Sequence, residues 1–211
     1  MYTRGELSFA VHKLEKFSVN PGKVHFEGLV HLLRNIRDNK TLGLKYYADL
    51  NDATVTDLLR QANLNTKNHL MAFSDSSWQD FTDTGRSTEA YIIFCQGGPI
   101  DHGTHVTVPV VQSSAESEYN SACTAGMALA HFRMLVHELL NEDPDMVPKE
   151  ALLIFLDSKS AMCMANNGND TKHTRHIARR MHFVRNGEKC KMHKTDWCEV
   201  GLQFETLVPR M

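Results

Sequence analysis

Two segments near the N-terminus, between Leu7 and Ile36, carry apolar residues at helical spacing. An Asn-Pro-Gly sequence at positions 20–22 separates them, and these residue types favour turns. The pattern therefore predicts two helices joined by a turn. A short strand is expected at 42–48. The polar stretch 49–68 that follows is interpreted as a linker, which places a boundary near residue 65.

After this boundary the pattern changes from helical spacing to short runs of strand length. Residues 69–75 alternate between apolar and polar, and residues 88–95 and 104–111 are rich in β-branched and aromatic side chains. A Gly-Gly-Pro sequence at 97–99 is expected to form the turn between the latter two runs. Three successive strands with tight connections predict an antiparallel meander.

The next segment predicts a long amphipathic helix over 114–141, which begins at Ser113 or Ser114 and carries acidic residues in its first turn. The continuous apolar run 151–156 is typical of a strand buried on both faces, as in the parallel part of a mixed sheet. The remaining expected elements are a short helix from Ser158, a basic helix at 176–184 and a last strand at 189–197.

Composition limits the class of protein. The 211 residues are 42% hydrophobic and 23% charged, so we expect a cored domain plus an appendage. A net charge of −2 excludes a uniformly basic nucleic-acid binder, although it leaves room for a local basic patch. No apolar run approaches the roughly 18 residues that a membrane span needs, and the N-terminus lacks the apolar stretch of a signal peptide. We therefore expect an intracellular protein, in the cytoplasm or nucleus, with no membrane partner.

The five cysteines are odd in number and nowhere form a Cys-x-x-Cys motif. A disulfide framework is therefore not expected, and a reducing compartment fits best. The spacing also disfavours a zinc site, because zinc ligand pairs normally lie about two to four residues apart. The residues considered for such a site are Cys163, His173, Cys190 and Cys198.

Three acidic residues continue the core-facing pattern of their elements. Asp75 follows the apolar face of strand 69–75, and Asp157 directly follows the run 151–156. Glu118 begins the apolar stripe of the long helix. If these three carboxylates converged unpaired, burial and mutual repulsion would cost considerable free energy, which a divalent cation would offset. The stripe consists of Glu118, Ala122, Ala125, Leu129, Phe132, Val136 and Leu139.

Oxygen ligands favour Mg²⁺ or Mn²⁺, and two such ions about 4 Å apart promote phosphodiester hydrolysis. An ordinary structural role is the alternative, since an acid at a strand end commonly forms a turn or caps a helix. Asp157, which precedes Ser158, is a candidate cap of this kind. Spacing alone leaves both interpretations open. Glu116 lies about 200° around the helix from Glu118 and is not assigned.

Four sequence motifs resemble those of a known family, and this resemblance favours the metal-binding role of the acids over the structural one. AFSDSSWQDFTDTGRSTEAYIIFCQGGPI, VQSSAESEYNSA, LLIFLDSKSAMCMANN and HTRHIARRMHFVRNGE resemble, in order and spacing, the ribonuclease H domain of copia-type long-terminal-repeat retrotransposon polyproteins. Upstream, FAVHKLEKF, NPGKVHFEGLVHLLRNIRDN and TLGLKYYAD are similar to the end of the reverse transcriptase region. The resemblance covers nearly the whole chain, and the combination of motifs is specific.

The resemblance implies an α/β fold: a ribonuclease H-like mixed five-stranded sheet flanked by helices, at 66–211, preceded by a small helical reverse transcriptase remnant at 1–65. It also implies cleavage of the RNA strand of RNA:DNA hybrids with Mg²⁺ or Mn²⁺. Asp75, Glu118 and Asp157 match the family's three leading metal carboxylates, and they are the expected catalytic and metal-binding residues. The remaining polymerase domain of an intact element is a further expected partner.

The C-terminal motif departs from the family pattern. The family closes its acidic set with an aspartate in a segment resembling LADIxTK, whereas this chain has GLQFETLVPRM, with Thr206 at the aspartate position and Glu205 beside it. Either Glu205 substitutes poorly, or the fourth carboxylate is lost. We therefore expect a degenerate fragment of an element with reduced activity, or none. The alternative is a catalytically inactive nucleic-acid or protein-binding remnant. An integrase-like nuclease of the same fold superfamily is disfavoured, because its acidic triad would need a different helix placement.

A local basic patch is predicted at 171–194, where eight Lys or Arg residues accompany one acid. Such residues bind phosphates without sequence preference, although a solvated helix face remains the alternative. His176 matches a recurrent family histidine, and a core hydrogen bond is equally compatible with its position. Trp78 and Trp197 are candidates for either packing or base stacking. The expected nucleic-acid contacts are Arg86, Lys172, Arg175, His176, Arg179 and Arg180.

Overall fold

The computed structural model describes residues 4–41, 46, 70–81, 83–95, 98–108, 110–139, 152–166, 183–184, 186 and 193–197. Within these ranges no helix is long and apolar enough to cross a membrane. The predicted strand 42–48, apart from Tyr46, and the boundary near residue 65 lie outside the described residues. The division into segments 1–65 and 66–211 stays a prediction.

A five-stranded sheet in the order β3-β2-β1-β4-β5 organises the chain. β1 pairs antiparallel with β2, and β2 pairs antiparallel with β3, whereas β4 runs parallel to β1, and β5 runs parallel to β4. The expected meander and the expected parallel part are therefore both present. The strands are β1 (Leu70–Phe81), β2 (Arg86–Cys95), β3 (Gly98–Val106), β4 (Leu152–Leu156) and β5 (His193–Trp197).

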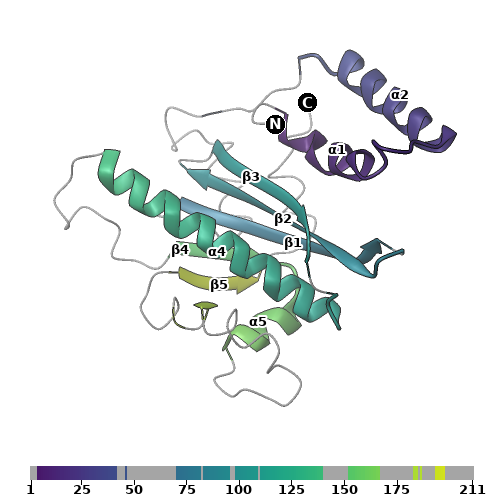
Figure 1. Ribbon diagram of the computed structural model, residues 1–211. Coiled ribbons are helices and arrows are strands. Elements are labelled where there is room, and N and C mark those ends of the chain that lie inside the picture. The colour runs from purple at the N-terminus through teal and green to yellow at the C-terminus, as the bar shows by residue number, and fades with distance from the viewer. Residues whose placement is uncertain are drawn as a thin grey trace.

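Helices flank this sheet, and Figure 1 shows α4 lying across one of its faces. The two predicted N-terminal helices are present on either side of the Asn-Pro-Gly turn, and the short helix expected from Ser158 is also found. The helices are α1 (Ser8–Glu15), α2 (Lys23–Asp38), α4 (Ser114–Leu139) and α5 (Lys159–Asn166), with a 3₁₀ turn η1 (Gly5–Leu7) before α1.

The position predicted for the third strand is wrong. β3 begins at Gly98 and ends at Val106, so the expected turn residues Gly98 and Pro99 pair with Cys95 and Phe94 instead. β3 lies at the end of the strand order. An edge strand tolerates proline and polar residues because one side of its backbone needs no partner strand. The strand therefore lacks the apolar alternation by which buried strands are predicted.

The main core lies between the sheet and α4. It contains Leu70, Ala72, Ile93, Tyr119, Ala122, Cys123, Ala125, Leu129, Leu152, Ile154, Leu156, Ala161 and Val184. The predicted stripe of α4 is buried from Glu118 to Leu129, but Leu139 is 72% exposed. On the other face of the sheet, Phe73 stacks on Phe155 with ring centroids 5.1 Å apart. Burial on both faces holds β1 and β4 firmly in register.

α1 also contacts the hairpin formed by β1 and β2. The ammonium groups of Lys13 and Lys16 lie 4.3 and 4.4 Å from the ring centroid of buried Phe81. Lys13 pairs with Asp80 and Lys16 with Asp83, each with a shortest N···O distance of 2.6 Å. We refer to these five residues as the α1–hairpin contact.

Candidate metal centre

The pairing of β1 with β4 sets the positions of two acids. Met71 is opposite Leu153, and Phe73 is opposite Phe155. Asp75 therefore lies two residues beyond a matched pair on β1, and Asp157 lies two residues beyond the same pair, just after β4. Since parallel strands advance equally per residue, their carboxylates reach the same end of the sheet. The buried apolar part of β1 and the whole of β4 thus lead directly to two neighbouring acids, although β1 itself continues to Phe81.

The start of α4 adds the third acid. The Ser113 hydroxyl accepts the Glu116 N–H at 3.2 Å, and the Glu116 carboxylate accepts the Gln112 N–H at 3.0 Å. These two bonds fix the first turn much as a capping box does, except that Glu116 reaches the residue before the cap instead of the cap itself. Glu118 follows in the second turn, facing the sheet. Glu116 thus has a structural function, in agreement with its omission from the candidate ligands.

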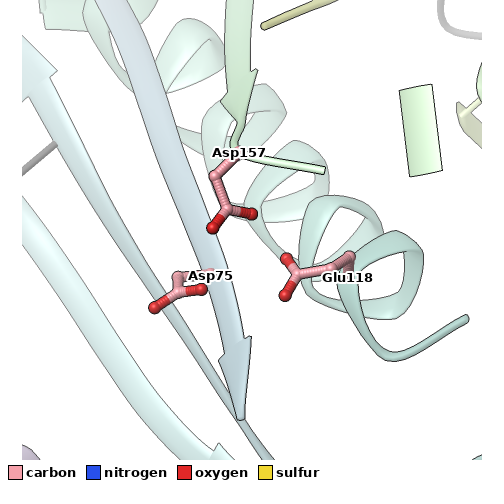
Figure 2. A group of neighbouring side chains, drawn as sticks. All are labelled: Asp75, Glu118 and Asp157. Atoms are coloured by element: carbon pink, nitrogen blue, oxygen red, sulfur yellow. The ribbon is translucent and has the colours of Figure 1, made fainter. Parts of the chain in front are cut away.

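The three predicted carboxylates are brought together. One oxygen from each of Asp75, Glu118 and Asp157 lies within 4.8 Å of the others. Figure 2 shows the three side chains converging from β1, α4 and the end of β4. Asp157 is not needed as a helix cap, because the neighbouring Ser158 caps α5: its hydroxyl accepts the Ala161 N–H. The structure therefore places all three acids in one cluster.

Burial and charge raise the pKa of two of these acids. Burial is the main cause that raises the pKa of Glu118 to about 8, and the charges of Asp157 and Asp75 raise it further, while the bonds from Ser76 oppose the shift. The pKa of Asp157 is also raised, by burial first and then by Asp75. Crowded acids that hold protons in this way carry unfavourable electrostatic energy when they ionise.

The two oxygens of Glu118 have different surroundings. Oε1 accepts the hydroxyl of Ser76 at 2.9 Å and the Ser76 N–H at 3.3 Å. Oε2 is buried and has no hydrogen-bond partner among the described residues. A buried carboxylate oxygen without a donor is costly, and a cation would compensate it. The all-oxygen set therefore fits a hard divalent ion such as Mg²⁺ or Mn²⁺.

Comparison with known proteins identifies relatives for this chain. It is 28% identical over 188 residues to the retrovirus-related Pol polyprotein from transposon RE2 of Arabidopsis thaliana, an alignment that covers 88% of this chain and 11% of the relative. The corresponding polyprotein from transposon RE1 of the same plant is 27% identical, with the same two coverages. Homologues of this chain thus include retrovirus-related Pol polyproteins of plant transposons.

The chain spans about 11% of the length of these curated relatives. No protein-family model matches it. Among solved structures, ribonuclease H1 from Halobacterium salinarum NRC-1 is similar with a TM-score of 0.45 and 13% identity, over 65% of this chain and 96% of that one. The predicted fold class, a ribonuclease H-like mixed five-stranded sheet flanked by helices, is confirmed by the strand pairings and helices described above.

Most of the predicted nucleic-acid contacts fall outside the described residues: Lys172, Arg175, His176, Arg179 and Arg180. Glu205 and Thr206 also lie outside the described residues, so the interpretation of the C-terminal motif stays a prediction. Arg86 is described, and it lies exposed at the start of β2, opposite Phe81. Trp78 is 43% exposed, and its indole N–H donates to the Val111 carbonyl at 3.1 Å. Its ring is therefore anchored at one edge.

Sequence reasoning missed two polar residues beside the cluster. Ser76 holds Glu118, but nothing in the sequence indicates which way its hydroxyl points. Glu89 on β2 is 1% exposed, and its carboxylate lies 3.0 Å from His105 and 3.3 Å from Thr124. A glutamate within a strand gives no indication that it is buried. Because Glu89 is occupied by these neighbours, we do not add it to the candidate ligands.

Proposed function

We propose that this chain is a copia-type ribonuclease H that cleaves the RNA strand of RNA:DNA hybrids with Mg²⁺ or Mn²⁺. The observation that carries the proposal is the cluster of Asp75, Glu118 and Asp157, in which the buried Oε2 of Glu118 has no hydrogen-bond partner among the described residues. Homology to transposon Pol polyproteins supports a nucleic acid as the substrate. The exposed side of Asp75 offers the approach for a phosphodiester.

In this proposal the chain holds three carboxylates in fixed positions. Asp75, Glu118 and Asp157 would hold the ion, which when bound activates water for attack on phosphorus and stabilises the leaving oxygen. Each acid extends from an element packed in the core, so the carboxylates need little reorganisation when substrate arrives. The burial of Glu118 keeps water away from one side of the cluster.

A cleavage assay on a labelled RNA:DNA hybrid tests the proposal. In Mg²⁺ or Mn²⁺ we expect the wild-type chain to cut the RNA strand, at the reduced rate that its altered C-terminal motif predicts. We expect Asp157→Asn to lose at least about a further hundredfold in rate, because it removes a ligand charge worth several kcal/mol in the transition state. Asp38→Asn is the matched control, since Asp38 is exposed at the end of α2 and pairs only with neighbouring Arg37 among the described residues.

Two outcomes would contradict the proposal. One is the absence of cleavage by a wild-type chain that unfolds cooperatively, which would favour the non-catalytic binding remnant. The other is cleavage that Asp157→Asn leaves unchanged, because the activity would then come from elsewhere. Single-stranded RNA and duplex DNA of the same sequence serve as substrate controls, and we expect neither to be cut at a comparable rate.

A further inference from the structure

Reciprocal hydrogen bonds join β1 and α4 beside the carboxylate cluster. From the strand, the Ser76 hydroxyl reaches Oε1 of Glu118 at 2.9 Å. From the helix, the Ser121 hydroxyl lies 2.8 Å from the Asp75 carbonyl and 3.0 Å from the Ala90 carbonyl. The strand thus holds the helix at Glu118, and the helix holds the strand at Asp75, so both bonds fall on candidate ligands.

The bond from Ser76 makes the two Glu118 oxygens inequivalent. With Oε1 engaged by the hydroxyl and N–H of Ser76, rotation of the carboxylate is restricted. The remaining oxygen, Oε2, is buried without a partner among the described residues. Figure 2 shows the carboxylate of Glu118 directed toward the two aspartates. A hydrogen bond that satisfies one oxygen orients the other toward a shared ion.

We infer that Ser76 is a positioning residue for the metal centre: its hydroxyl holds Oε1 of Glu118 so that Oε2 is presented as a ligand between Asp75 and Asp157. This inference rests on the proposed function. Ser76 itself provides no ligand in this arrangement. Its contribution is to keep Glu118 in one orientation, and loss of the hydroxyl leaves only the weaker backbone N–H bond at 3.3 Å.

Two substitutions of equal shape isolate the hydroxyl. Ser76→Thr keeps it, whereas Ser76→Val replaces it with a methyl group, and both residue types are favoured in strands. We expect Ser76→Val to weaken Mn²⁺ binding about tenfold or more relative to Ser76→Thr, which is the usual effect of losing a group that orients a metal ligand. Ser77→Val is the control, because Ser77 is the exposed neighbour on the same strand.

The measurement is the rise in melting temperature with increasing Mn²⁺, which gives an apparent affinity without requiring activity. Melting of the metal-free variants separates a general loss of stability from a loss of metal affinity. Equal Mn²⁺ affinities of the Val and Thr variants, with wild-type binding intact, would overturn the inference and leave the proposed function standing. The absence of any Mn²⁺ effect on the wild-type chain would overturn the proposed function and the inference together.

Discussion

Two groups of acidic residues, each with one member on β1, differ in the partners that surround their carboxylates. In the α1–hairpin contact, Asp80 pairs with Lys13 of α1 and Asp83 pairs with Lys16 at the C-cap of this helix, each at 2.6 Å. In the carboxylate cluster, a few residues earlier on the same strand, Asp75 has two other acids as neighbours. For Asp75 and Glu118, no pairing with a lysine or arginine is found in the described part of the chain.

The pKa shifts of Asp83 and Glu118 have opposite signs. The hydrogen bond from Lys16 lowers the pKa of Asp83, whereas burial and the two aspartates raise that of Glu118 to about 8. The acids that connect α1 to the hairpin thus have lysine partners, whereas Asp75 and Glu118 have no basic partner among the described residues. The contrast assigns a stabilising role to the first group and supports the proposal that the second group binds a cation.

The largest effect is expected from Phe81→Ala, which removes the buried ring beneath both lysines. Phe-to-Ala changes at buried sites cost about 3–5 kcal/mol, and in a chain of this size each kcal/mol lowers the melting temperature by about 2–4 °C. Thermal unfolding measures the loss. We expect Mn²⁺ affinity to stay unchanged, because the acids of the cluster are not touched.

Phe26→Ala is the control for this variant, since Phe26 is 62% exposed on α2 and its loss is expected to change stability by about 0.5 kcal/mol at most. A Phe81→Ala protein that folds but binds Mn²⁺ more weakly would show that the two acidic groups are coupled. The α1–hairpin contact would then affect metal binding as well as stability.

A smaller effect is expected from Glu118→Gln in the metal-free protein, and it is a gain of stability instead of a loss. Because the folded-state pKa of Glu118 is raised from 4.5 to about 8, the folded state holds the proton longer, and stability falls as the pH rises through this window. The glutamine side chain does not ionise, so Glu118→Gln removes this loss of stability. At pH 8 we expect the variant to melt at least about 3 °C higher than the wild type, since one pKa unit is worth about 1.4 kcal/mol.

Melting curves between pH 5 and pH 9, in the presence of a chelator, measure this difference. Glu138→Gln is the matched control, because Glu138 is exposed on the same helix. Parallel pH profiles for wild type and Glu118→Gln would contradict the raised pKa. We also expect Mn²⁺ to stabilise the wild type at pH 8 and to stabilise Glu118→Gln much less.

The smallest effect is expected from Lys16→Met, which keeps most of the apolar stem over Phe81 but removes the charge opposite Asp83. Exposed ion pairs contribute about 0–1 kcal/mol, and salt screens them. Urea unfolding at low and high salt measures the change, which we expect to shrink as salt increases. A loss well above 1 kcal/mol that persists in high salt would show that this pair contributes more than an exposed ion pair does.

The sequence predicted the parts of the fold and site that depend on regular spacing. The helices around the Asn-Pro-Gly turn follow from a repeat of apolar residues. The convergence of Asp75 and Asp157 follows from two buried apolar runs that each lead to an acid. Glu118 follows from its place at the start of a buried helical stripe. These predictions succeed because burial imposes a period on the chain.

Other features have no such period. β3 was misplaced because an edge strand accepts Pro99 and polar residues, and the pairing of Lys13 with Asp80 joins residues 67 positions apart. The direction of the Ser76 hydroxyl depends on the distance between β1 and α4, which only the packed core sets. Contacts between side chains of distant elements therefore had to come from the structure.

The parallel register of β1 and β4 bears on how this site tolerates changes in chain length. Asp75 and Asp157 meet because each lies two residues beyond the Phe73–Phe155 pair, whatever the length of chain that connects the strands. Insertions in the connections outside the paired strands would leave the two acids together. Deletion of one residue within β4 would instead turn Asp157 toward the opposite face, because side chains alternate along a strand.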